Sequence, residues 1–98
     1  MKVDVHAQGF PLTEALTEHT ERRLRFALKH AADRVQRVSV RLADVNGPRG
    51  GVDKKCSVHI TVSGAPDIVT EDTEADMYVA INRAVDRVGR TVLRRMTQ

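Results

Sequence analysis

Four arginines near the end of the sequence point most directly to chemistry. They are Arg83, Arg87, Arg90 and Arg94, spaced by four, three and four residues. In an α-helix this spacing places them within about 60° of one another, along roughly 16 Å of the axis. Arginine binds phosphate through a planar fork of donors, so such a row fits the backbone of a polyanion such as RNA. The alternative is a solvated helix face. However, such faces usually interleave acids, and only Asp86 is placed to pair within the row, with Arg90.

A second basic row lies upstream, where Arg22, Arg25 and Lys29 follow one another at three and four residues. Arg23 and Phe26 run beside this row. The Phe26 ring has two interpretations, and both stay open at this point. It packs against a neighbouring helix, or it is exposed among cations and able to stack on an unpaired nucleobase.

A glycine-rich segment over residues 44–55 is predicted to be a loop that holds three bases, Arg49, Lys54 and Lys55. Its backbone could approach a phosphate closely. It is not a P-loop, because neither a Gly-Lys-Ser/Thr step nor a helix follows. A long hairpin loop without a ligand is the alternative. Downstream, a cluster of acids precedes the last helix, and three roles are open to it: to repel RNA from that end, to bind a basic protein, or, by default, to solvate a turn. Its members are Asp67, Glu71, Asp72, Glu74 and Asp76.

Nothing in the sequence indicates catalysis. Cys56 and His59 lie three residues apart on one predicted strand, so they point to opposite faces. One cysteine can form neither an internal disulfide nor a cysteine-rich zinc site. We therefore expect that the protein is not an enzyme. We also expect no catalytic residue, no metal, no cofactor and no small-molecule substrate. Cys56 is expected to be a buried thiol facing inward with Val58 and Ile60.

The chain of 98 residues, with a net charge of +3, has the size of one domain, and we expect residues 1–98 to form it. No apolar run approaches the ~18 residues of a spanning helix. The N-terminus lacks the apolar core of a secretory signal. These features predict a cytoplasmic protein without a membrane partner.

The alternation of apolar and polar residues predicts four strands, over residues 2–8, 38–43, 56–63 and 68–73. Helical periodicity predicts two helices, from an N-cap at Thr13 to about residue 32 and from an N-cap at Asp76 to about residue 95. Each strand has one apolar face, so both helices should cover the same side of the sheet. The expected fold class is α+β, a β-α-β-β-β-α two-layer sandwich with Val5, Val40, Val58 and Ile60 buried beneath Leu24 and Val88.

Two segments carry a resemblance to a known family. Residues 74–82 resemble the Asp-Met-Tyr-Ala-Ala-Ile-Asp helix start of ribosome hibernation-promoting factors and ribosome-associated inhibitors, formerly called sigma-54 modulation proteins. Residues 12–16 are similar to the start of that family's first helix. Asn82 stands in place of the family's Asp, and Val79 in place of an Ala. The resemblance covers nearly the whole chain and indicates the short form, without the C-terminal dimerisation domain of the long members.

The resemblance implies a fold like that of double-stranded-RNA-binding domains. It implies binding to ribosomal RNA of the small ribosomal subunit, in the channel for mRNA and tRNA, which silences idle ribosomes in stress. The positions that match the family's ribosome-contacting surface are Arg22, Arg25, Lys29, Arg83, Arg87 and Arg90. From the charge pattern and the loop composition alone, we add Arg94 as a further RNA-binding position and Arg23, Phe26, Arg49, Lys54 and Lys55 as accessory contacts. The alternative is a divergent member that acts as a protein-interaction or regulatory domain without ribosome binding.

Overall fold

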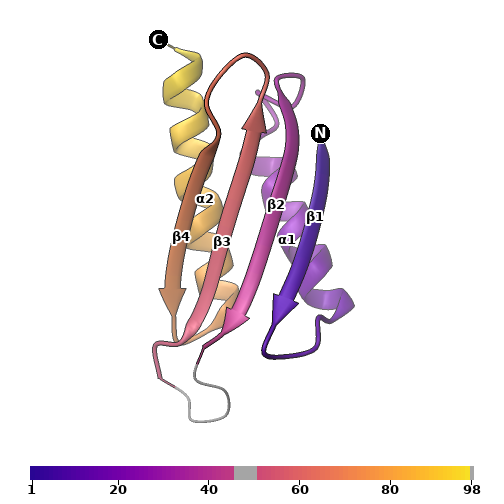
Figure 1. Ribbon diagram of the computed structural model, residues 1–98, viewed down its shortest axis with the longest axis vertical. Helices are drawn as coiled ribbons and strands as arrows, with labels where there is room; N and C mark the ends of the chain where they lie inside the picture. Colours follow the sequence, from indigo (N-terminus) through magenta and orange to yellow (C-terminus); the bar gives the residue numbers. More distant parts are fainter. Residues whose placement is uncertain (46–50, 98) are drawn as a thin grey trace.

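The computed structural model of the protein describes residues 1–45 and 51–97. Six elements follow in the order β-α-β-β-β-α: β1 (Lys2–Gln8), α1 (Glu14–Ala27), β2 (Val35–Asp44), β3 (Lys54–Val62), β4 (Ile68–Glu74) and α2 (Met77–Met96). Figure 1 shows the four strands side by side in one layer, with both helices behind it. The predicted α+β sandwich with helices on a single face is confirmed.

The sheet has the order β1-β2-β3-β4. β1 pairs with β2 in parallel, as expected for strands joined through a helix, whereas β2, β3 and β4 form an antiparallel meander. The register aligns the inward-facing residues across the sheet, with Val5 opposite Val40, Val40 opposite Val58, and Val58 opposite Thr70. The helices therefore rest on one continuous apolar surface.

The core lies between this surface and the two helices. Val40, Val58, Ile60, Leu24 and Val88 are each fully buried, as predicted. Val5 is only half-buried, so the expectation of full burial is wrong for this residue. β1 lies at one edge of the sheet, whereas α2 packs against β3 and β4, on the same face but towards the opposite edge.

The first helix is shorter than predicted. It ends at Ala27 with Leu28 as its C-cap, and β2 already begins at Val35. Between them the chain makes tight turns, in which the N–H of Ala31 donates to the carbonyl of Leu28 and the N–H of Arg34 to that of Ala31. These turns advance by three residues and keep Leu28 and Ala31 buried. The apolar spacing therefore continues past the helix end, and that is why the periodicity overestimated its length.

The two helices run parallel and in step. His19 Nε2 lies 2.7 Å from Asn82 Oδ1, and one turn later Arg23 Nη2 lies 2.9 Å from Asp86 Oδ1. A further turn along, Gly89 approaches Ala27 so closely that a Cβ on the glycine would lie 3.2 Å from the Ala27 Cβ. The close contact at Gly89 fixes the relative position of the outer faces of α1 and α2.

Candidate nucleic-acid interface

The outer face of the helix layer carries both basic rows that the sequence predicts. All four arginines of the α2 row and all three cations of the α1 row are exposed: Arg83, Arg87, Arg90 and Arg94; Arg22, Arg25 and Lys29. Lys29 follows the end of α1, within the turns that lead to β2. Between the two rows, α1 and α2 meet along a line of contact, here called the seam, which includes the pairs His19–Asn82 and Arg23–Asp86. The structure thus brings the two rows onto neighbouring parallel helices.

The first half of the α2 row is not free. The Arg87 guanidinium donates to the backbone carbonyl of Glu71 at 3.0 Å and to the Asp72 carboxylate at 3.1 Å. Arg83 Nε lies 3.7 Å from the Glu74 carboxylate. Asp72 and Glu74 continue the helix-facing side of β4 that Ile68 and Thr70 begin, so they meet the arginines of the adjacent helix. The sequence analysis considered only acids within the helix itself, whereas the acids that meet Arg83 and Arg87 come from β4.

The second half of the row remains open. The Arg90 side chain has no hydrogen bond or ion pair with any residue that the structure describes, and among those residues the Arg94 guanidinium donates a hydrogen bond only to the Thr91 hydroxyl, at 3.3 Å. With Leu93 and Arg87 they line a shallow hollow on the outer helix face. Asp86, the expected partner of Arg90, pairs with Arg23 instead. Within the α2 row, Arg90 and Arg94 are the cations available to an external anion.

Phe26 is 67% exposed, so the interpretation in which it packs against the other helix is wrong. The helices meet through Ala27 and Gly89, and this contact leaves the neighbouring ring outside the seam. The ammonium of Lys29 lies 4.4 Å from the centre of the ring. Phe26 is thus an exposed aromatic surface among the cations of α1.

The predicted loop over residues 44–55 is shorter than expected, because Asp44 ends β2 and Lys54 begins β3. Lys54 Nζ lies 2.7 Å from the fully buried Asp53 and 3.4 Å from Asp44. The hydrogen bond that the Lys54 ammonium donates to the Asp53 carboxylate is the main reason that the pKa of Lys54 is raised. Lys55 Nζ lies 3.2 Å from the Glu71 carboxylate. Both lysines are engaged within the fold, and Arg49 lies outside the described residues.

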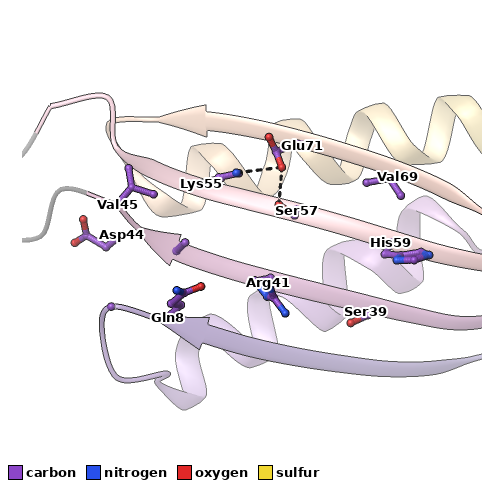
Figure 2. A pocket seen from close by; sticks show the side chains of 12 residues that line it. Gln8, Ser39, Arg41, Asp44, Val45, Lys55, Ser57, His59, Val69 and Glu71 are labelled. Carbon is purple, nitrogen blue, oxygen red and sulfur yellow. Dashed lines mark hydrogen bonds and ion pairs between the residues drawn. The ribbon is translucent and has the colours of Figure 1, made fainter.

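Sequence reasoning missed the hollow on the open face of the sheet, which is lined in part by Arg41, His59 and Ser39. Figure 2 shows Lys55 and Ser57 both directed towards Glu71 in this hollow. Three side chains of this face lie against acids: Arg37 against Asp4, Lys55 against Glu71, and His59 against Asp67. Because Arg37 and Lys55 are matched by acids, this face offers an external polyanion fewer unpaired cations than the helix layer.

The five acids before α2 have defined partners rather than a solvating role. Besides the three acids already described, Asp67 lies 2.7 Å from His59 Nε2, and Asp76 accepts the backbone N–H of Tyr78 at 2.8 Å as the N-cap of α2. The expectation that the cluster merely solvates a turn is therefore wrong. These acids fix β4, the start of α2 and the first half of the arginine row.

Among residues 1–45 and 51–97, the histidines, the cysteine and the acids form no group of three or more that could hold a metal ion. Neither described helix is both long and apolar enough to cross a membrane.

Comparisons with known proteins identify one family and two solved structures that this chain resembles. The family model for "Sigma 54 modulation protein / S30EA ribosomal protein" matches residues 3–98. The structure of a ribosomal subunit interface protein from Coxiella burnetii is 16% identical and superposes over 100% of both chains with a TM-score of 0.84. The N-terminal domain of Protein Y from Thermus thermophilus is 22% identical and superposes over 96% of this chain and 98% of that domain, with a TM-score of 0.79. At these identities the two structures show the shared fold. No curated protein matches the sequence.

Proposed function

Because the chain belongs to the Sigma 54 modulation protein / S30EA ribosomal protein family, we propose that it associates with the ribosome as a cytoplasmic hibernation factor. In this proposal it binds ribosomal RNA of the small subunit in the channel for mRNA and tRNA. It inhibits translation by occupying that channel, without any chemical step. The description of the Coxiella burnetii neighbour as a subunit interface protein supports a site that faces the space between the subunits.

The observation that carries the proposal is the set of unpaired cations on the outer helix face. Arg90 and Arg94 have no acidic partner in the described part of the chain, and Arg22, Arg25 and Lys29 form no ion pair there either. Exposed guanidinium groups that are not neutralised within the fold can release their water and bind phosphate oxygens in pairs. Phosphate contacts of this kind supply much of the affinity of a protein for RNA and fix its orientation.

The alternative, a protein-interaction domain that acts through its acids, is less well supported. Asp72 and Glu74 lie against arginines of the same chain, and Asp67 against His59. A basic partner would have to displace these internal cations. The acids are therefore assigned to the fold, and the external contacts to the helix face.

The proposal is tested by co-sedimentation with purified small ribosomal subunits over a series of salt concentrations. The variant Arg90→Ala/Arg94→Ala removes two exposed cations from the helix face. Charged hydrogen bonds contribute about 1.5–3 kcal/mol each before non-additivity, so we expect about a hundredfold weakening, or ~2.8 kcal/mol. The affinity of the native protein should fall steeply as salt rises.

The matched control is Lys2→Ala/Arg41→Ala, which removes the same charge from the open sheet face. We expect its affinity for the subunit to stay within about twofold of the native value, because surface substitutions away from a contact have small effects. Equal weakening in both variants would point to net charge alone and would reject the helix face as the binding surface. Failure of the native protein to co-sediment would reject ribosome binding itself.

A further inference from the structure

Phe26 is the most exposed of the large apolar residues on the two helices, and Arg22, Arg25 and Lys29 lie within four residues of it in the sequence. The residue is 67% exposed, and the Lys29 ammonium lies over its ring at 4.4 Å from the ring centre. A cation above an aromatic face is attracted by the ring quadrupole and restrains the orientation of the ring. The Lys29 ammonium covers only part of the ring. The rest of the aromatic surface stays available to a flat partner.

The charge around this ring restricts the chemistry of that partner. Residues 22–32 include Arg22, Arg23, Arg25 and Lys29 but no acid. Arg23 is held in the seam by Asp86, whereas Arg22 and Arg25 project outward without an ion pair among the described residues. A ligand that suits both the ring and these cations carries a flat apolar group next to negative charge. A nucleotide has this composition, with a base and an adjoining phosphate.

We propose that Phe26 is a stacking platform for one unpaired nucleobase, and that Arg22, Arg25 and Lys29 bind the phosphates on either side of it. This inference rests on the proposed function, because it places the base within the RNA that the helix face binds. Lys29 is close enough to the ring to leave its face and pair with the phosphate of the stacked nucleotide. The platform adds to phosphate binding a contact that paired RNA cannot make.

The base must be unpaired, because the bases of an A-form duplex are stacked inside the helix and the major groove is too narrow for a side chain. Loops, bulges and single strands offer bases that are free to stack on an aromatic ring. Stacking depends on the π-face that every base has, so the site should select single-stranded RNA without selecting a particular base.

The arrangement favours a nucleotide over the apolar pocket of a protein partner. An apolar pocket is matched by a continuous apolar patch, whereas the exposed groups beside Phe26 in the sequence are guanidinium and ammonium groups. The two readings differ in what they require of residue 26. A pocket accepts any apolar side chain of suitable volume, but stacking requires a flat aromatic ring.

The test measures the affinity of the native protein, Phe26→Ala, Phe26→Leu and Phe26→Trp for purified small subunits and for three RNA probes. The probes are an oligouridine single strand, an abasic strand of the same length, and a duplex of matched length. We expect Ala and Leu at position 26 to weaken binding to the subunit and to oligouridine about tenfold, or ~1.4 kcal/mol, and Trp to preserve it. Binding to the abasic strand and the duplex should not change in any variant.

Phe26 is exposed, so these substitutions should leave the protein folded, with a thermal unfolding midpoint close to that of the native protein. Retention of native affinity in Phe26→Ala, together with weakening in Arg90→Ala/Arg94→Ala, would reject the platform and leave the proposed function standing. Preserved affinity in Phe26→Leu with loss in Phe26→Ala would show an apolar pocket and reject stacking. Absence of binding to both the subunit and oligouridine would overturn the platform and the proposed function together.

Discussion

The first two arginines of the α2 row meet acids of β4, whereas the last two meet none in the described part of the chain. Arg87 is bound by Asp72 and by the Glu71 carbonyl, and Arg83 lies near Glu74. Arg90 and Arg94 lie on the same helix at the same spacing and point into solvent. Residues that look equivalent on a helical wheel therefore have different roles.

The difference comes from the neighbouring strand. The helix-facing side of β4 changes along its length from apolar, at Ile68, to acidic, at Asp72 and Glu74. The acidic end lies beside the first half of α2, so an arginine there stabilises the contact between helix and sheet. The second half of α2 passes the apolar end of β4, which offers no carboxylate to pair with Arg90. We infer that the first half of the row serves the fold and the second half serves binding.

The largest effect is expected from a substitution that unfolds the domain, because α2 and with it both halves of the arginine row would be lost. Val88 is fully buried between them, and Val88→Asp would place an unpaired charge in the core. We expect a loss of more than about 4 kcal/mol, enough to unfold a domain of this size. Circular dichroism during thermal unfolding measures this change.

The matched control for this variant is Val79→Asp, an exposed position in the first turn of α2, where a helix N-terminus favours an acid. We expect it to unfold near the temperature of the native protein. A folded Val88→Asp variant would show that α2 does not depend on this packing, and the distinction between the two halves of the row would lose its basis.

The fold followed from the sequence to a large extent, because each strand has one apolar face and each helix one apolar side. The N-caps Thr13 and Asp76 were predicted correctly, since their side-chain oxygens accept the first free N–H groups. The end of α1 was not, because the turns after Leu28 keep the same three-residue apolar spacing as a helix. Periodicity alone does not distinguish these two conformations.

The candidate site was predicted less completely. The sequence indicated which cations lie on helix faces, since that depends on spacing within one element. It did not indicate that Asp86 pairs with Arg23 or that Asp72 pairs with Arg87, because these partners are 63 and 15 residues apart. Such pairs depend on the register of β4 and on the approach of the two helices at Gly89, and neither leaves a local pattern.

The next largest effect concerns Cys56, which lies opposite Asp72 in the β3–β4 register and is fully buried, as predicted. Burial, with a smaller contribution from the Asp72 charge, raises the pKa of the Cys56 thiol from 9.0 to about 12. Between these values the unfolded chain loses a proton that the folded protein keeps. Stability should therefore fall by up to about 1.4 kcal/mol per pH unit as the pH rises from 9 to 12.

Urea unfolding of the native protein and of Cys56→Ala across this pH range isolates the effect, because the other titrating groups are common to both. We expect the alanine variant to be less stable at neutral pH and to depend less on alkaline pH. The native thiol should also react slowly with a thiol reagent until the protein unfolds. Parallel pH profiles, or rapid labelling of the folded protein, would show that the region beneath Asp72 is open to solvent.

The smallest effect is expected from a substitution that makes the first half of the row resemble the second. Asp72→Asn removes the charge that neutralises Arg87 while keeping the shape of the side chain. The pair is half-exposed on the arginine side, so we expect a loss of at most ~1 kcal/mol of stability. Arg87 could then bind phosphate, and the affinity for the small subunit should rise about threefold. The slope of log affinity against log salt should steepen by the amount that one more phosphate contact gives.

Asp4→Asn is the control, because it removes the same charge from an ion pair on the open sheet face. Equal affinity of the two variants for the small subunit would mean that Arg87 already leaves Asp72 and binds RNA in the native protein. The two halves of the row would then differ in the free protein but not in the complex.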